Sequence, residues 1–590
     1  MQLKSTLLNS CYVEWMVSIL ALKYGDTSSN NINPLAQQKQ AGLSIMLDGA
    51  LFIIVLLGIA ATFNDFSNSK YSNGFSELIV TIVWLAVLFV KINFTTLRYK
   101  FTNKACSVIN RKNEIDYSYL DTSLQIGLST GKLASRGHKM GLEADQVLNI
   151  PFPSCCTNFI ALGSTGEGKT AFFIKPMLSQ LCIASNCSMG GLIFDIKGNF
   201  IFEDVLPIME HQGQMDRFKI IGTKPGQLKI NLIAGLNPEQ VTDYLCSVYL
   251  LAGNKKDIDF WLTSALLLTK NALRILIYTR DYTLRGLYQF AFKPERRKML
   301  MDEAKRNHAE LLEPDIDFQN AVDYYEKEFS ALPENMQGSI NGSLTPILEP
   351  FQGAELQTVF SDINPENNYD LSRILNDGDI IAVDLNLATY ASPGRAIYTL
   401  IKLRYYNLIQ TRFNPDSGLN KERYCFFMCD EFQDLIAAGS AAGLNDATFF
   451  SKSRSQRNIS IVTSQSYSAL ANAVGGDDKL NTILANFVNK IVFKLNDAKT
   501  IKYIQSLVGT AEVQKVSYNE GTSQRGWGND TSDNQGYSVQ TVDKNVIDAE
   551  LISQLGVVPG TDNYRYALLL STIDGNTAND VIITTALPRE

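Results

Sequence analysis

The chain has 590 residues, and its 53 Lys and Arg against 60 Asp and Glu give a net charge of −7. Hydrophobic residues make up 45% of it, which supports a sizeable core and excludes disorder over most of its length. The acidic balance argues against a protein whose whole surface coats nucleic acid, but it is compatible with a local basic channel. The nine Cys and three His lack the spacing of zinc ligands, so we expect no structural zinc site.

Two long apolar runs stand near the N-terminus, Leu43–Phe63 and Leu78–Phe94. As helices they would reach roughly 25–32 Å, which matches a bilayer core of about 30 Å. Both runs are apolar on all sides, which favours membrane spans over buried core helices. We therefore predict a transmembrane hairpin over residues 43–94 with a short external loop, 64–77. Residues 1–42 form a cytoplasmic segment before it, and an interfacial helix there is one interpretation.

The placement of Lys and Arg predicts the orientation of this hairpin. The loop 64–77 carries one Lys, whereas nine basic and three acidic residues between Lys91 and Met140 give a local net charge of +6. Because positive residues remain on the cytoplasmic side, we expect both termini in the cytoplasm. Residues 95–150 are interpreted as a basic membrane-proximal linker. Topology and contact with anionic lipid explain its charge, and steering of a substrate is the alternative.

From about residue 151 onward, short apolar runs alternate with helical stretches, as is typical of βα units around a mostly parallel sheet. The run Asn158–Leu162 leads directly into GSTGEGKT, which satisfies the phosphate-loop pattern in a strand–loop–helix context. Glycines let backbone amides surround a phosphate, and the following helix begins at its positive end. We expect Lys169 to neutralise the β- and γ-phosphates of ATP and Thr170 to bind Mg²⁺. The candidate nucleotide-binding residues are Gly163, Ser164, Thr165, Gly166, Glu167, Gly168, Lys169 and Thr170.

A second candidate element is the segment YCFFMCDEFQD, Tyr424–Asp434. Five apolar residues there end in two carboxylates, as expected of a buried central strand that delivers them to its C-terminal edge. Asp430 is the predicted second Mg²⁺ ligand. Glu431 is the predicted base that accepts a proton from, or orients, the attacking water. Together with the phosphate loop, this pair predicts an ATPase.

A third element is the predicted strand Asn458–Gln465, with Gln465 as its last residue. A polar amide at this place could sense the γ-phosphate from an adjacent strand. Arg454, shortly before the strand, is a candidate arginine finger that reaches the ATP of a neighbouring subunit. Arg457 competes for that role, and ordinary solvated charges are the alternative for both.

These elements together resemble the type IV secretion coupling proteins, TraD-like relatives of the FtsK and HerA pumps. The resemblance covers the order of two spans, phosphate loop, long insertion, strand ending in Asp-Glu and strand ending in Gln. Finer marks are Pro176 after the phosphate loop and the segment GLIFDIKGNF, which is similar to the family's strand ending "DpKGE". In that segment Asp195, Lys197 and Gly198 match, whereas Ile196 and Asn199 depart from the pattern. A further mark is the strand and helix of Asn486–Gly509.

The resemblance implies a RecA-like α/β nucleotide-binding domain over residues 151–239 and 352–590, with an all-α insertion domain over 240–351. It also implies a homo-hexameric ring in the bacterial inner membrane that uses ATP and Mg²⁺. The implied partners are the secretion channel, adaptor proteins, secreted proteins and relaxase–DNA complexes. Gln465 and Arg454 would complete the catalytic set of Lys169 and Glu431.

The C-terminal part of the sequence and two alternative functions complete the sequence-based expectations. Residues 521–540, rich in Gly, Ser, Asn and Gln, are predicted to form a mobile loop or linker. The long C-terminal tail of the Dot/Icm-type relatives is not seen before Glu590. An FtsK-like translocase of chromosomal DNA is the first alternative function, and a substrate-binding hub with little ATP turnover is the second. The intact Lys169, Asp430 and Glu431 count against the hub.

Overall fold

The computed structural model describes residues 120–252, 259–311, 315–437, 444–524 and 531–587, all of them within one compact unit, residues 111–590. The predicted N-terminal segment 1–42 and the predicted spans 43–63 and 78–94 lie outside the described residues. Among the helices that are described, none has both the length and the apolar character needed to cross a bilayer.

A twelve-stranded mixed sheet forms the centre of this unit. Its parallel strands, in spatial order, are β9 (Asn489–Val492), β3 (Phe159–Leu162), β8 (Asn458–Ser464), β7 (Cys425–Cys429), β4 (Gly190–Asp195), β6 (Ile380–Asp384) and β5 (Phe218–Gly222). Beyond β9 the sheet continues with antiparallel strands: β13 (Tyr564–Leu570), β16 (Asp580–Thr585), β1 (Ser123–Ser129) and β2 (Val147–Pro151), with β12 (Gly556–Val557) paired to β13.

Most residues of the parallel strands are buried, because both faces of the sheet are covered. In β7, Cys425, Phe427 and Cys429 enter the core on one face, whereas Phe426 and Met428 enter the core on the other. The second face is covered by α5 (Phe152–Cys155), η2 (Thr170–Ile174), α6 (Lys175–Cys187), η3 (Ile201–Val205) and α7 (Leu206–His211). The first face packs against α16 (Leu387–Thr411), η7 (Phe432–Asp434), α17 (Asp446–Phe450), α18 (Tyr467–Val474), α19 (Asp477–Leu484), α20 (Ala498–Val508) and α21 (Ala549–Gln554).

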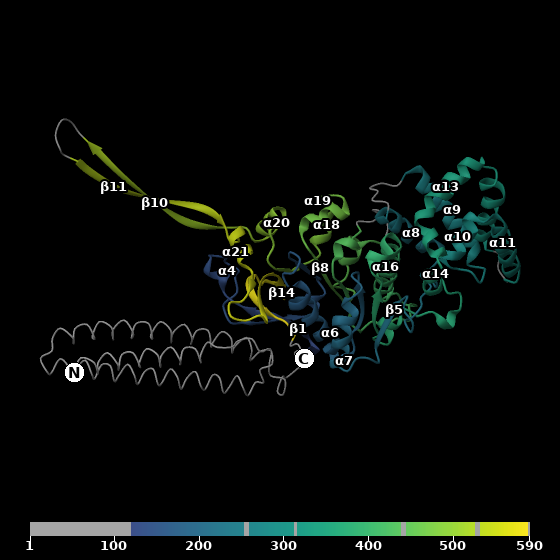
Figure 1. Ribbon diagram of the computed structural model, residues 1–590, viewed down its shortest axis with the longest axis horizontal. Helices are drawn as coiled ribbons and strands as arrows, with labels where there is room; N and C mark the ends of the chain where they lie inside the picture. The colour runs from purple at the N-terminus through teal and green to yellow at the C-terminus, as the bar shows by residue number, and fades with distance from the viewer. Residues whose placement is uncertain (1–119, 253–258, 312–314, 438–443, 525–530, 588–590) are drawn as a thin grey trace, which may run out of the picture. The chain divides into compact units, whose positions relative to one another are not determined.

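Between β5 and β6 the described residues form a group of helices that cluster together in Figure 1. They are α8 (Pro238–Ala252), α9 (Phe260–Leu276), α10 (Leu284–Phe292), α11 (Pro294–Ala309), α12 (Ile316–Asp323), η4 (Tyr324–Phe329), α13 (Glu334–Leu348), η5 (Glu349–Gln352) and α14 (Ala354–Phe360). Leu268, Phe290 and Phe351 are buried in their common core. Shorter elements complete the fold: α4 (Lys132–Ser135), η6 (Pro365–Asn367), α15 (Arg373–Asn376), β14 (Thr572–Ile573) and β15 (Asn576–Thr577).

The predicted linker over residues 95–150 is wrong in its second part. Residues 123–129 and 147–151 are β1 and β2, and β1 pairs with β16 near the other end of the chain. The Asp580 carboxylate adds to this connection, since it accepts hydrogen bonds from the backbone amides of Gly131 and Leu133 at 2.6 and 3.0 Å. Local charge suggested a linker because the pairing partner lies hundreds of residues away.

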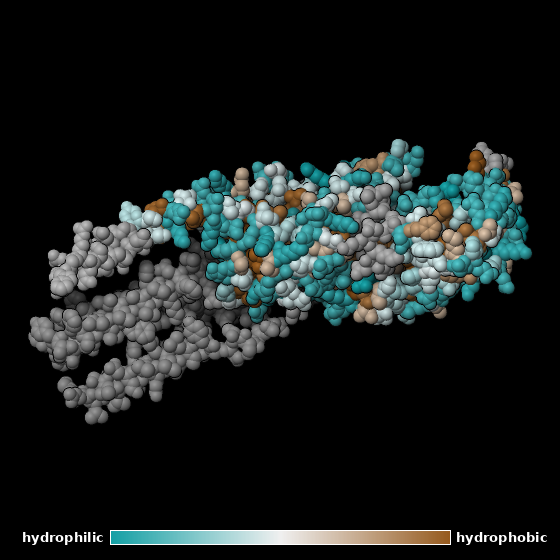
Figure 2. Space-filling view, turned by 90° about the horizontal axis from the view of Figure 1, so that it is seen from above, coloured by the Kyte–Doolittle hydropathy of each residue, from teal (hydrophilic) through white to brown (hydrophobic). Residues whose placement is uncertain are grey.

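The predicted mobile loop over residues 521–540 is wrong for 521–524 and 531–540, which belong to strands, whereas 525–530 lie outside the described residues. Strands β10 (Thr510–Gln524) and β11 (Thr531–Asn545) form an antiparallel hairpin in unbroken register from Thr510 opposite Asn545 to Gln524 opposite Thr531. The polar composition of the stretch indicated a loop, but β-branched pairs such as Val516 opposite Val539 favour strands at its base. The hairpin projects from the sheet as a separate ribbon (Figure 1). Figure 2 shows a mostly hydrophilic surface with small scattered hydrophobic areas.

Candidate nucleotide-binding site

The phosphate loop connects β3 to η2 at the C-terminal edge of the parallel strands. Gly168 has φ of 93°, and a Cβ there would lie 2.6 Å from the Phe172 ring, so only glycine fits this turn. The Lys169 side chain is buried, and its Nζ donates to the carbonyls of Gly163 at 2.6 Å and Ser164 at 3.2 Å. Burial lowers the pKa of Lys169, although the nearby carboxylates of Glu431 and Asp430 act in the opposite direction. The lysine thus lies folded back over its own loop, at the place where a phosphate would replace the carbonyls as its partner.

The helix after the phosphate loop accommodates Pro176 through a wide turn. Thr170–Ile174 form a π-helical turn, and Pro176 then falls in the first turn of α6, where its missing N–H is tolerated. The cost that a proline has in the interior of a regular helix is therefore avoided.

The carboxylate pair comes directly after β7, whose neighbours in the sheet are β4 and β8. Asp430 is buried, and one of its oxygens, Oδ2, accepts a hydrogen bond from the Thr170 hydroxyl at 3.1 Å. The Thr463 hydroxyl donates to Oδ1 of the same carboxylate. The two predicted Mg²⁺ ligands, a hydroxyl and a carboxylate, therefore lie side by side although they are 260 positions apart. Oxygen donors of this kind fit Mg²⁺.

Glu431 is buried beside Asp430 and adopts a left-handed backbone conformation, with φ of 55°. This conformation costs free energy for a residue with a side chain, and such positions cluster at functional sites. Its Oε2 accepts hydrogen bonds from the amides of Gln433 at 2.6 Å and Gln465 at 3.3 Å. Burial alone would raise the pKa of Glu431, but hydrogen bonds from Lys197 and Gln433 outweigh burial, and the pKa is lowered. Glu431 is therefore an ionised carboxylate held by two amides.

Lys197 completes the charge balance of the site. Its Nζ lies 3.2 Å from Asp430 Oδ2 and 2.8 Å from Glu431 Oε1. Burial would lower the pKa of Lys197, but the two carboxylates prevail and raise it. Asp195, at the end of β4, holds the turn that carries Lys197, because its carboxylate accepts the backbone amides of Gly198 at 2.7 Å and Ile201 at 2.9 Å. Two cations, Lys169 and Lys197, thus face two carboxylates.

Sequence reasoning assigned no role to Lys197, Thr463 or Gln433. The sequence does carry a signal for Lys197, because the segment DIKG directly follows a strand-like run, just as Asp430 does. The strands β4 and β7 are neighbours with Phe194 opposite Cys429, so the residues after their C-terminal ends must lie close together. Nothing in the sequence indicated which strands are neighbours.

The two arginine candidates lie away from this cluster. Arg454 is exposed and precedes the N-terminal end of β8, whereas the phosphate loop begins at the C-terminal end of β3, which runs parallel to β8. It therefore stands at the opposite edge of the sheet from the phosphate loop of its own chain. Arg457 forms an ion pair with Glu422 and lies over the ring of Tyr424, 5.8 Å from its centroid. An intrachain contact thus occupies Arg457, whereas Arg454 is exposed.

Comparison with known proteins bears on the family and the fold of the chain. Residues 425–556, from β7 to β12, match the family model described as the TraM recognition site of TraD and TraG. A search of curated proteins finds no match. Among solved structures, the bacterial conjugative coupling protein TrwBdeltaN70 in its unbound monoclinic form is similar with a TM-score of 0.51 at 15% identity, over 79% of this chain and 94% of that one.

Two further structures of the same coupling protein match with TM-scores of 0.50. The complex with the non-hydrolysable GTP analogue GDPNP is 15% identical and covers 79% of this chain and 95% of that one. The trigonal form in complex with sulphate is 16% identical and covers 80% and 94%. At these identities the likeness concerns the fold.

The fold and the site define a mixed α/β protein with a large parallel sheet and a phosphate loop, of the RecA-like kind. The resemblance to TraD-like type IV coupling proteins is confirmed, by the family model over residues 425–556 and by the fold shared with TrwB.

Proposed function

We propose that this protein is a membrane-anchored, ring-forming ATPase that recruits substrates and drives them into a type IV secretion channel. The observation that carries the proposal is the convergence of Lys169, Thr170, Asp430 and Glu431 at one edge of a sheet with the coupling-protein fold. The conjugative coupling protein of the same fold has been solved with a nucleotide analogue bound, which supports nucleotide binding here as well.

Each residue of the site has a separate task in this proposal. When bound, Mg²⁺ would neutralise phosphate charge between Thr170 and Asp430. Lys169 would leave the carbonyls of its loop for the β- and γ-phosphates. Glu431, ionised and oriented by Gln465, would hold the attacking water and accept its proton. Arg454 would serve the site of a neighbouring subunit, which makes hydrolysis depend on ring formation.

The membrane and the partners are parts of the same proposal. The apolar runs 43–63 and 78–94 and the Lys/Arg asymmetry around them support an anchor in the bacterial inner membrane with both termini in the cytoplasm. The match of residues 425–556 to a region described as a recognition site supports docking of DNA-processing partner proteins there. Relaxase–DNA complexes, protein effectors or both are the proposed substrates, delivered with the help of adaptors to the channel by a homo-hexamer.

Two substitutions test the assignment of the site. Lys169→Ala should abolish both nucleotide binding and turnover, because backbone amides alone leave most phosphate charge unneutralised. Glu431→Gln should retain nucleotide binding and stop turnover, because the amide cannot accept the proton while the Mg²⁺ ligands are untouched. Fluorescent-nucleotide binding and phosphate release measure the two effects in purified full-length protein. Equal loss of binding in both variants would contradict the division of roles, and normal turnover of Lys169→Ala would refute the ATPase itself.

The cargo needs a different experiment, which also separates secretion from the FtsK-like alternative. Crosslinking in cells and then capture of the intact membrane protein identify what is bound. Secreted proteins or a relaxase with its DNA strand support the proposal, whereas chromosomal duplex DNA without protein cargo supports the translocase.

A further inference from the structure

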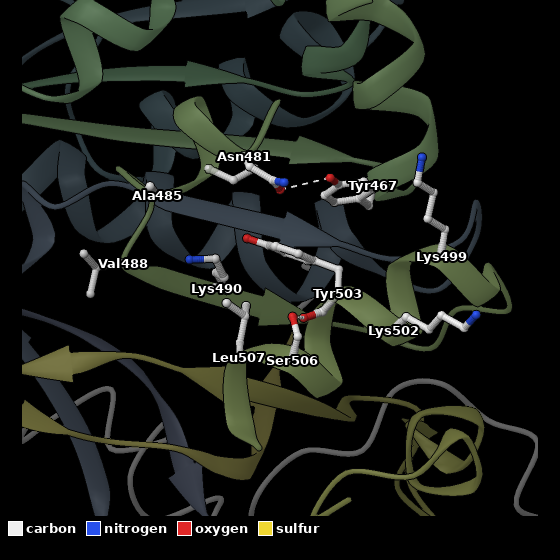
Figure 3. A pocket seen from close by; sticks show the side chains of 11 residues that line it. Tyr467, Asn481, Ala485, Val488, Lys490, Lys499, Lys502, Tyr503, Ser506 and Leu507 are labelled. Carbon is white, nitrogen blue, oxygen red and sulfur yellow. Dashed lines mark hydrogen bonds between the residues drawn. The ribbon is translucent and has the colours of Figure 1, made fainter. Parts of the chain in front are cut away.

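A pocket of about 710 Å³ lies on the face of the sheet that carries α18, α19 and α20, with β9 at its base. Its lining comes from these four elements and the turn before β9 (Figure 3). The phosphate-loop residues, Asp430, Glu431 and Lys197 are not among the lining residues, so the pocket is separate from the nucleotide site. Its size falls within the range of roughly 300–1,000 Å³ in which proteins hold small ligands.

The most unusual residue of the pocket is Lys490, which points from β9 into it. This side chain is only 7% exposed, and its Nζ donates to the backbone carbonyl of Phe487. Among the described residues, no ion pair with a carboxylate is found for Lys490. Burial is the cause that lowers its pKa to about 8. A buried ammonium without a counter-charge is costly, and an anion bound in the pocket would offset this cost.

Two further lysines and two aromatic rings complete the lining. Lys499 and Lys502 stand on the α20 side, and Lys499 is paired with Asp477 at 2.6 Å (Figure 3). The rings of Tyr467 and Tyr503 lie 4.8 Å apart and form an aromatic wall. The Tyr467 hydroxyl donates to the Asn481 side chain at 2.9 Å. The Tyr503 hydroxyl is directed toward the same space as the Lys490 ammonium (Figure 3).

We propose that this pocket is a second ligand site, which binds the phosphate of a nucleotide next to Lys490 and its base against the wall of Tyr467 and Tyr503. Lys490, which forms no ion pair with a carboxylate among the described residues, suits a phosphate, whereas Lys499 is already paired with Asp477 and Lys502 is directed away from Lys490 (Figure 3). A planar base can stack on a tyrosine ring, and this favourable contact does not depend on which base it is. The ligand is either a free mononucleotide or one unit of a single strand, since both present the same phosphate and base.

Protection of Lys490 from an amine-reactive reagent tests the proposal on the full-length protein. Mass spectrometry reads the modification of each lysine separately, and AMP is the probe because it lacks the phosphates that the phosphate loop would bind. We expect AMP to slow the modification of Lys490 at least fivefold while Lys479, exposed on α19 and outside the pocket lining, reacts unchanged. Adenosine should not protect Lys490. Inorganic phosphate should protect it less than AMP does. Stronger protection by a short oligo(dT) than by AMP identifies a strand as the ligand, and the reverse identifies a mononucleotide.

Titration calorimetry of two variants supplies the second measurement. With Lys169→Ala as background, Lys490→Met should weaken AMP binding about tenfold or more, the effect of losing one hydrogen bond between two charged groups. Lys479→Met, on α19 but outside the pocket lining, is the matched control and should bind AMP with unchanged affinity. An unchanged affinity in Lys490→Met, or equal protection by adenosine and AMP, overturns the proposal. Because protection is measured on the unsubstituted lysine, a folding defect of a variant cannot hide the answer, and neither result depends on ATP hydrolysis.

Discussion

The sharpest test of the proposed catalytic group of Asp430, Glu431 and Lys197 is the replacement of Lys197 by Met. In the structure its Nζ contacts Glu431 Oε1 at 2.8 Å and Asp430 Oδ2 at 3.2 Å. A hydrogen bond between charged groups contributes about 1.5–3 kcal/mol, and the 49% exposure of Lys197 places it at the lower end. A loss of about 1.5 kcal/mol from a group that holds the base corresponds to a roughly tenfold slower kcat. Nucleotide affinity should change little, because Lys169 remains.

A pH profile distinguishes this role from a structural one. Lys197 helps to keep the pKa of Glu431 low, so its removal raises that pKa, and the acidic limb of the kcat profile should move to higher pH. The matched control is Lys224→Met. Lys224 is 53% exposed and pairs at 2.8 Å with Asp384, a carboxylate that ends the nearby strand β6. Steady-state phosphate release at saturating ATP, measured over a range of pH, gives both kcat and the position of its acidic limb. An unchanged kcat and pH limb in Lys197→Met, or an equal effect of Lys224→Met, would refute the reasoning.

Three other predictions address assembly, stability and topology. Arg454→Ala should bind nucleotide but lose ATP turnover by orders of magnitude. Mixing this variant with Lys169→Ala should restore part of the turnover, because one supplies an intact phosphate loop and the other an intact Arg454. If mixing restores no turnover, Arg454 is an ordinary surface charge. Lys490→Met should raise the free energy of unfolding at pH 7 by up to ~3 kcal/mol, because the pKa of Lys490 falls from 10.5 to about 8 on folding. Between pH 8 and 10.5 the folded protein binds fewer protons at Lys490 than the unfolded chain does, so the wild-type free energy of unfolding should rise over this range. Urea unfolding at several pH values should show this rise in the wild type and not in Lys490→Met. A single Cys at position 72 should react with an impermeant reagent outside the cell, and one at position 103 only after permeabilisation. Reversed labelling would place the ATPase where ATP is absent.

Chemistry that depends on neighbouring positions could be predicted from the sequence. The phosphate loop, the pair Asp430–Glu431 and the strand before Gln465 are contiguous signals, since a loop that surrounds phosphate needs its glycines, lysine and hydroxyl within eight positions. The parallel character of the sheet was equally accessible, because strands buried on both faces are continuous apolar runs. These features identified the class of site before any residue was placed in space.

The order of the strands was decided only by the tertiary structure. Parallel strands carry the residues after their C-terminal ends to one edge of the sheet, so the neighbours β4 and β7 bring Lys197 to Glu431 across more than two hundred positions. A distant pairing likewise places β1 beside β16, where local charge suggested a linker. The hairpin of β10 and β11 is a local pairing, which the polar composition of the stretch did not indicate. In the sequence Lys490 is one basic residue in an apolar run, and only the packing of α18, α19 and α20 over β9 makes it a buried charge at the base of a pocket. Burial and neighbourhood are properties of the assembled sheet, because they depend on which distant segments exclude water from one another.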